Sequence, residues 1–119
     1  MTDAETLVRA CLAAMEARDL PAAQAMLAPG FAMVFPGDVH MTSLAQVLEW
    51  AAPRYRFVRK TFDRFDAAGE VVYITGTLYG EWPDGTPFDG IRYVDRFEIA
   101  EGRLIRQDVW NDMGEIRPR

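Results

Sequence analysis

The sequence predicts an α+β fold in which helices fill the first half of the chain and strands the second half. Two observations support this order. Apolar residues near the N-terminus recur at the spacing of a helix, whereas from Tyr55 onward they alternate with polar residues. Glycine-containing turns then separate the alternating segments. We therefore expect helices packed on one face of a curved antiparallel or mixed sheet, with one pocket between the two layers.

The helices are predicted from their first residues and their apolar stripes. Thr2 and Glu5 have the spacing of a capping box, and an apolar stripe follows, made of Leu7, Val8, Cys11, Leu12 and Met15. Asp19 is expected to cap a second, short helix that ends at residues 28–30. A short strand over 31–35 precedes a third helix, which begins after Thr42 or Ser43 and ends at Pro53.

The second half of the chain is predicted to form four strands, over 55–66, 70–82, 88–99 and 103–112. The segments between them, "DAAGE", "PDGTP" and "AEGR", each place a glycine beside polar residues. Loops this short make consecutive strands antiparallel. The 119 residues contain no linker or repeat, so residues 1–119 are predicted to form a single domain.

The segment "IRYVDRFEI", residues 91–99, carries an unusual carboxylate. One face of this strand would hold Ile91, Tyr93, Phe97 and Ile99, and Asp95 lies on that same face. An ionised carboxylate among apolar side chains loses hydration, so it needs a partner or an altered protonation equilibrium. Asp95 is therefore the first candidate for acid–base chemistry, and a purely structural bond to a buried arginine, tryptophan or tyrosine is the alternative.

The last strand leaves two registers open. In the first register Gln107, Val109 and Asn111 face the pocket and offer neutral amides near Asp95. In the second register the inward residues are Asp108, Trp110 and Asp112. We favour the first register.

Other polar residues are weaker candidates. His40 is the only histidine, in a segment expected to form a loop between the short strand and the third helix, and an imidazole can shuttle protons near neutral pH. The basic run Arg54, Arg56, Arg59, Lys60 and Arg64 is interpreted as a solvated sheet face or as pairs across a dimer interface.

Composition excludes several functions. The net charge of −5 argues against nucleic-acid binding, and the single cysteine excludes an internal disulfide and a cysteine-rich zinc site. The sequence shows no phosphate-binding loop and no metal-ligand spacing, so we expect no cofactor and no bound metal. No apolar run is long enough to span a membrane, and no signal peptide is recognisable. A cytoplasmic location is expected.

Two segments resemble a known superfamily. "MEARDLPAAQAMLAPGFAMVFPG" is similar to the opening of nuclear transport factor 2-like domains, and "YVDRFEIAEGRLIRQDVWND" is similar to their final hairpin. This superfamily includes ketosteroid isomerases, SnoaL-like polyketide cyclases, scytalone dehydratase and limonene epoxide hydrolase. The resemblance covers nearly the whole chain. It implies a cone-shaped α+β barrel with one deep apolar pocket, which often dimerises through the outer sheet face.

The resemblance also implies roles for single residues. Asp95 matches the aspartic acid with which ketosteroid isomerases donate a hydrogen bond to the substrate oxyanion. Cys11 stands where those enzymes have a tyrosine donor, and Phe35 stands where they have the general base. The Arg-x-Asp pair of limonene epoxide hydrolases is not matched either, because Tyr93 stands two residues before Asp95.

Two hypotheses follow. The first is a cofactor-independent isomerase, cyclase or dehydratase that acts on a small apolar, oxygen-bearing molecule. Asp95 would be its catalytic group, helped by His40, and its pocket wall would include Cys11, Met15, Phe35, Trp50, Tyr93 and Phe97. The second is a ligand-binding or dimeric assembly module without turnover. A homodimer through the sheet is expected from the resemblance and from the outward row of Tyr73, Thr75, Thr77 and Tyr79.

Overall fold

The computed structural model describes residues 2–118 and contains the three predicted helices, but the second ends at Ala25, and residues 28–30, where its end was predicted, belong to a strand. The helices are α1 (Asp3–Glu16), α2 (Leu20–Ala25), α3 (Leu44–Ala51) and α4 (Met113–Ile116). The strands are β1 (Leu27–Phe35), β2 (Val39–Met41), β3 (Phe57–Lys60), β4 (Arg64–Ala68), β5 (Val71–Glu81), β6 (Pro87–Ala100) and β7 (Arg103–Asn111). Strand β2 and helix α4 were not predicted, because three or four residues are too few to show a period.

The starts of the first three helices are confirmed. The side-chain oxygens of Thr2, Asp19 and Ser43 each accept a hydrogen bond from the backbone N–H three residues later, at 3.1, 3.3 and 3.2 Å. Each bond satisfies one N–H that a first helical turn leaves without a partner. Local sequence therefore determines where these helices begin.

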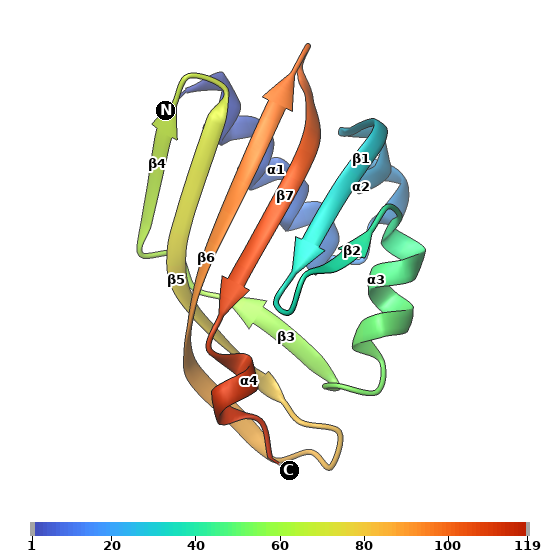
Figure 1. Cartoon of the computed structure of the whole chain (residues 1–119), viewed down its shortest axis with the longest axis vertical. Coiled ribbons are helices and arrows are strands. Elements are labelled where there is room, and N and C mark those ends of the chain that lie inside the picture. Colours follow the sequence, from blue (N-terminus) through green and yellow to red (C-terminus); the bar gives the residue numbers. More distant parts are fainter. Residues whose placement is uncertain (1, 119) are drawn as a thin grey trace.

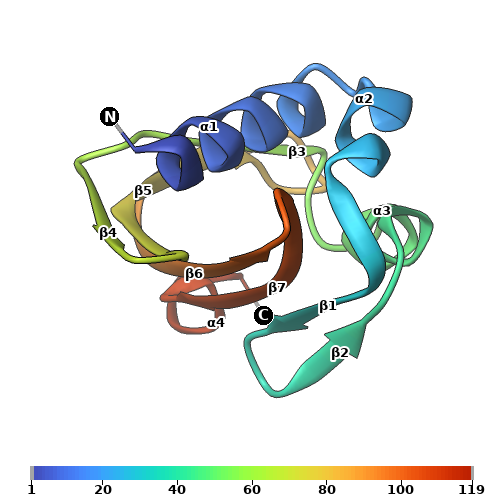
Figure 2. The same cartoon turned by 90° about the horizontal axis from the view of Figure 1, so that it is seen from above.

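The strands form one strongly curled sheet in the order β2-β1-β7-β6-β5-β3, and β4 also pairs with β5. Strands β1 and β7 are parallel, and the other pairs are antiparallel. Helix α1 lies across the concave face of this sheet, whereas α4 lies on the convex side (Figures 1 and 2). The predicted α+β fold with a curved mixed sheet against N-terminal helices is confirmed.

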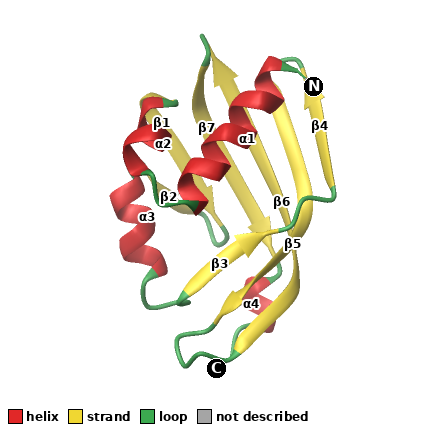
Figure 3. Ribbon diagram, turned by 180° about the vertical axis from the view of Figure 1, so that it is seen from behind, coloured by secondary structure: helices red, strands yellow, loops and turns green. Residues whose placement is uncertain are grey.

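The predicted strand 55–66 is divided. Both β3 and β4 pair with the same edge of β5, and residues 61–63 interrupt them. The sheet bends at this interruption, so that β3 runs at an angle to β4 (Figure 3). Gly76 of β5 makes the bend possible, because a Cβ atom there would lie 2.1 Å from the carbonyl oxygen of Thr61.

The pairing of β6 with β7 decides the register of the last strand. Tyr93, Asp95 and Phe97 lie opposite Asn111, Val109 and Gln107, so these six residues share the concave face. The favoured register is therefore confirmed. The turn between β6 and β7 is formed by Glu101 and Gly102, whose φ angles are 53° and 75°. A type I′ hairpin turn requires a positive φ at both of its central residues.

The core lies between α1 and the concave face. Val8 and Cys11 of α1 pack in one apolar cluster with side chains from the sheet, which include Met33, Val72, Ile74, Ile91, Phe97 and Leu104. Burial of this cluster holds α1 over the middle of the sheet. The concave side of β6 is therefore shielded from water by both layers.

Candidate functional site

Asp95 is fully buried in the centre of the concave face, with 0% of its surface exposed. Its neighbours across the sheet are Ile74 on β5 and Val109 on β7. The expected conflict between a carboxylate and an apolar row is therefore present in the structure. One carboxylate oxygen, Oδ2, accepts a hydrogen bond from the ammonium of Lys60 in an ion pair.

Lys60 reaches Asp95 from the end of β3. It lies opposite Leu78 of β5, whose side chain faces the core, and this pairing turns Lys60 inward. Its side chain is 23% exposed, so the ion pair is connected to solvent on the lysine side. Lys60 is also the only lysine in the sequence.

Tyr93 stabilises the position of Lys60. The ammonium nitrogen lies 4.9 Å from the centre of the Tyr93 ring, within the range of a cation–π contact. The Tyr93 hydroxyl donates a 2.7 Å hydrogen bond to the carbonyl oxygen of Thr61, the residue after Lys60. Burial, and then the negative charges of Asp95 and Asp63, raise the pKa of this hydroxyl above its usual value, which keeps it a neutral donor.

The second oxygen of Asp95 has no protein partner. Among the described residues, Asp95 Oδ1 and Trp50 Nε1 are two of three buried side-chain atoms that lack a hydrogen bond. Buried polar groups are normally paired, because an unpaired one costs about 1–3 kcal/mol. Both residues were predicted to line the pocket, and both present an open hydrogen-bonding position in the interior.

The three predicted residues of β7 share the face of Asp95 but differ in their contacts. Gln107 is 4% exposed beside Phe97, and Val109 lies directly opposite Asp95. Asn111 Oδ1 accepts a 3.0 Å hydrogen bond from the backbone N–H of Met113. Asn111 thereby holds the start of α4, so one of its polar atoms is already used within the protein.

The remaining predicted wall residues come from three elements. Cys11 and Met15 lie on α1, Phe35 ends β1, and Trp50 lies on α3. The rings of Phe35 and Trp50 meet edge to face with their centres 4.9 Å apart. Cys11 is buried in the core, and this burial raises the pKa of its thiol to about 11.

His40 lies apart from Asp95. It was expected in a loop, but it forms part of β2 and lies opposite Val34, which in turn lies opposite Asp108 on β7. His40, Val34 and Asp108 therefore share the convex face of the sheet. The side chain is 61% exposed and contacts Asp38 at 2.7 Å. The geometry does not support proton transfer between His40 and Asp95, because the sheet separates them.

The other buried aspartate also lies on the convex face. Asp108 is 8% exposed, and it is held by Arg106 at 2.9 Å and by Arg96 at 3.4 Å. Asp112 pairs with Arg92 at 2.7 Å. These ion pairs satisfy both carboxylates on the outer surface and leave Asp95 as the buried acid of the concave face.

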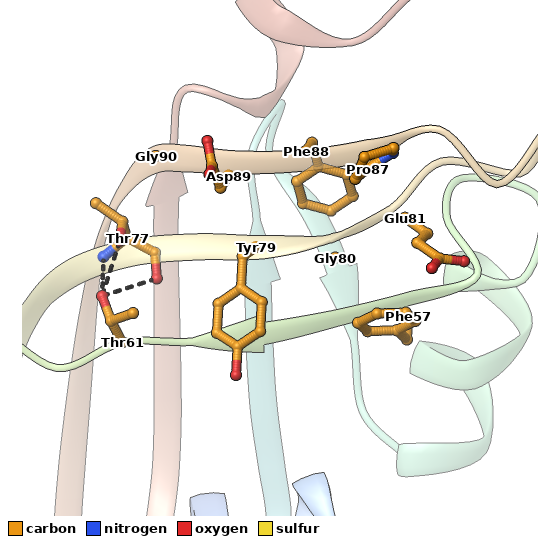
Figure 4. Close-up of a pocket in the computed structure, with 10 residues that line it drawn as sticks. All are labelled: Phe57, Thr61, Thr77, Tyr79, Gly80, Glu81, Pro87, Phe88, Asp89 and Gly90. Carbon is orange, nitrogen blue, oxygen red and sulfur yellow. Dashed lines mark hydrogen bonds between the residues drawn. The ribbon is translucent and has the colours of Figure 1, made fainter.

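Two surface hollows lie away from Asp95. The first, of about 700 Å³, lies at the bend of the sheet where β3, β5 and β6 meet (Figure 4). It is lined by Phe57, Thr61, Thr77, Tyr79, Gly80, Glu81, Pro87, Phe88, Asp89 and Gly90. The second lies between the start of α1 and the turns at Gly69 and Gly102. Neither is the enclosed pocket expected around Asp95, which stays a prediction.

The described residues also bear on metal binding and membrane insertion. Over residues 2–118, no group of three or more histidine, cysteine, aspartate or glutamate side chains is placed to hold a metal ion. No helix in that range has the length and hydrophobicity needed to cross a membrane.

Comparison with known proteins identifies the family. Residues 8–107 match the profile of the SnoaL-like domain. The chain belongs to the SnoaL-like domain family. Its predicted place in the nuclear transport factor 2-like superfamily is thereby confirmed. Curated protein sequences give no match to this SnoaL-like domain.

Solved structures similar to this SnoaL-like domain share its fold over nearly the whole chain. A nuclear transport factor 2-like protein of unknown function from Burkholderia pseudomallei is 21% identical, with a TM-score of 0.85 and coverage of 98% of this chain and 95% of that one. TerC, co-crystallised with polyporic acid, is 18% identical, with a TM-score of 0.84 and coverage of 97% and 95%. A putative SnoaL-like polyketide cyclase from Jannaschia sp. is 19% identical, with a TM-score of 0.77 and coverage of 96% and 88%. At these identities the similarity establishes the fold alone.

Proposed function

We propose that this SnoaL-like domain binds a small, largely apolar molecule with oxygen substituents on the concave face of its sheet. We further propose that Asp95 performs cofactor-independent acid–base chemistry on it, of the isomerase, cyclase or dehydratase type. One observation carries the proposal: a fully buried carboxylate keeps one oxygen without a partner among the described residues. In the proposal a ligand fills this open acceptor position, which is fully buried in the structure.

The contact with Lys60 favours one of the two expected roles of Asp95. A carboxylate in an ion pair accepts hydrogen bonds and protons, whereas only the protonated acid donates. The proton-acceptor role is therefore better supported than the oxyanion-donor role that the resemblance to ketosteroid isomerases implies. The apolar neighbours of Asp95 suit an apolar ligand, and their low polarity strengthens any charge interaction within the site.

The similar proteins support the proposal in general terms. TerC was co-crystallised with a small molecule, polyporic acid, and the Jannaschia protein is described as a putative polyketide cyclase. Both facts belong to those proteins. They make a small-molecule ligand the first class to test for this chain.

A titration with an apolar ketone tests the proposal. Propiophenone is added to ¹⁵N-labelled protein, and we expect saturable shifts at the amides of Tyr93, Phe97, Gln107 and Val109. Asp95→Asn should weaken this binding, whereas Asp108→Asn should leave it unchanged, because Asp108 is a buried aspartate of the opposite face. Shifts confined to Thr77 and Tyr79 would place the ligand in the outer hollow and contradict the proposal.

A ligand-binding or dimeric assembly module without turnover is the second candidate. Two positions that the resemblance assigns to catalysis hold Cys11 and Phe35, and neither supplies an acid–base group near neutral pH. Exchange of the α-hydrogens of bound propiophenone in D₂O separates the candidates. Exchange faster than in buffer, and lost in Asp95→Asn, supports the enzyme. Binding without exchange supports the module.

A further inference from the structure

The ion pair of Lys60 and Asp95 offers a free acceptor and a free donor side by side. Asp95 Oδ2 is occupied by the lysine, and Oδ1 has no partner among residues 2–118. The ammonium carries three N–H groups, and within the same range its hydrogen bond to Asp95 is its only one. The ring of Tyr93 covers part of the cation but accepts no conventional hydrogen bond there.

We infer that this pair recognises a neutral ligand with a hydroxyl and a carbonyl on adjacent carbon atoms, an α-hydroxyketone. The hydroxyl donates to Asp95 Oδ1, and the carbonyl oxygen accepts from Lys60 Nζ. The inference rests on the proposed function and names its ligand class. It also makes Lys60 a specificity-determining residue.

Charge balance favours a neutral ligand. The pair is already neutral as a whole, and an anionic ligand would bring its charge against the buried carboxylate of Asp95. A ligand with only an acceptor would leave the buried Oδ1 unpaired, and a ligand with only a donor would forgo the hydrogen bond that the partly exposed ammonium can donate. A hydroxyl next to a carbonyl satisfies both positions, because the two groups of the pair are themselves in contact.

The position of Lys60 suits this role. Its side chain is 23% exposed whereas Asp95 is fully buried, so Lys60 is the member of the pair that contacts solvent. A lysine head group is a compact charge on a flexible stem, which can shift to admit a ligand while keeping contact with Asp95. The hydrogen bond from the Tyr93 hydroxyl to the Thr61 carbonyl oxygen fixes the end of β3, which carries Lys60.

Three matched probes test the inference by calorimetry or NMR titration. Phenacyl alcohol carries both groups, propiophenone replaces its hydroxyl with a methyl, and 2-phenylethanol replaces its carbonyl with a methylene. We expect phenacyl alcohol to bind at least about tenfold more tightly than either analogue, because propiophenone leaves the buried Asp95 Oδ1 unpaired and 2-phenylethanol forgoes the hydrogen bond from the Lys60 ammonium. The Arg59→Met variant is the control and should keep this preference, because Arg59 lies on the other side of β3 and pairs with Glu16.

The double variant Lys60→Met/Asp95→Leu should bind all three probes within about threefold of one another, because both recognising groups are replaced by apolar ones of similar size. Equal binding of phenacyl alcohol and propiophenone by the natural protein would overturn the inference and leave the proposed function standing. A preference that survives in the double variant would overturn it too. If no probe binds saturably, the proposed function fails, and the inference fails with it.

Discussion

A buried carboxylate destabilises a fold unless its charge is paired, and the cation that pairs with Asp95 is Lys60. Removing one member of such a pair leaves the other without compensation, whereas replacing both with apolar side chains is often close to neutral. The pair is therefore expected to behave as one unit in stability measurements.

The Lys60→Met variant should lose about 2–4 kcal/mol of unfolding free energy, toward the lower end because Lys60 is partly exposed. The double variant Lys60→Met/Asp95→Leu should recover most of that loss. Urea denaturation measures both values. A double variant that is less stable than Lys60→Met alone would show that the two residues do not act as a pair.

The Cys11 thiol should make stability fall in alkaline solution. Its pKa is about 11 in the folded protein, against 9.0 for an ordinary thiol, so the unfolded chain loses the proton first. The stabilisation is complete below pH 9 and decreases by about 1.4 kcal/mol per pH unit between pH 9 and 11. Denaturation at several pH values should show a shallower decrease for Cys11→Ala, and equal slopes would contradict the burial argument.

The sequence predicted the burial of Asp95 but not its contact with Lys60. Alternation in 91–99 predicted that Asp95 is buried with Tyr93 and Phe97, because one strand determines which side chains share a face. Lys60 was grouped with the neighbouring arginines as a solvated face. Lys60 lies two residues after Val58 on the same strand, so the two side chains share a face, and this spacing was a local indication that Lys60 points inward. Contact with Asp95 depends on the bend at residues 61–63, which no local pattern predicts.

At the scale of elements, the bend between β3 and β4 positions Lys60. The backbone of Thr61 passes so close to β5 that only a glycine fits at position 76, and the Tyr93 hydroxyl occupies the space beside it. The sequence predicted one continuous strand here because residues 61–63 contain no glycine or proline to mark the interruption. The register of β7 could not be predicted from alternation, because both of its faces mix polar and apolar residues, but the resemblance favoured the register that the structure shows.

Gly76→Ala should destabilise the protein by about 3 kcal/mol or more, since the new methyl group would lie 2.1 Å from the Thr61 carbonyl oxygen. Gly114→Ala is the matched control. Position 114 lies in α4 with nothing within 4 Å of an added Cβ atom, and alanine favours helices over glycine. Thermal denaturation should separate the two variants. Equal stability of both would contradict the close approach.

At the scale of the whole molecule, the convex face of the sheet exposes large apolar side chains. Val94 and Trp110 lie directly opposite each other and are 37% and 53% exposed, and Tyr73 and Tyr79 are exposed on β5. Exposed apolar groups that share a face are typical of interaction surfaces. The predicted homodimer would cover this face. The sequence predicts the outward row on β5, and the favoured register of the last strand places Trp110 on the outer face as well.

Sedimentation at micromolar concentration should show a dimer, because a second copy would bury these apolar side chains on both subunits. Trp110→Glu should give a monomer with an unchanged fold, since Trp110 is exposed within one chain. His40→Ala, on an exposed edge strand of the same face, is the control and should stay dimeric. A natural protein that sediments as a monomer would remove the dimer prediction.

The central claim is that the concave face around Asp95 binds the ligand, and a crystal structure with phenacyl alcohol tests it most directly. We predict the ligand hydroxyl within about 3.0 Å of Asp95 Oδ1 and its carbonyl oxygen within about 3.2 Å of Lys60 Nζ. A ligand bound in the outer hollow beside Thr77 and Tyr79, with Asp95 and Lys60 unchanged, would contradict the claim.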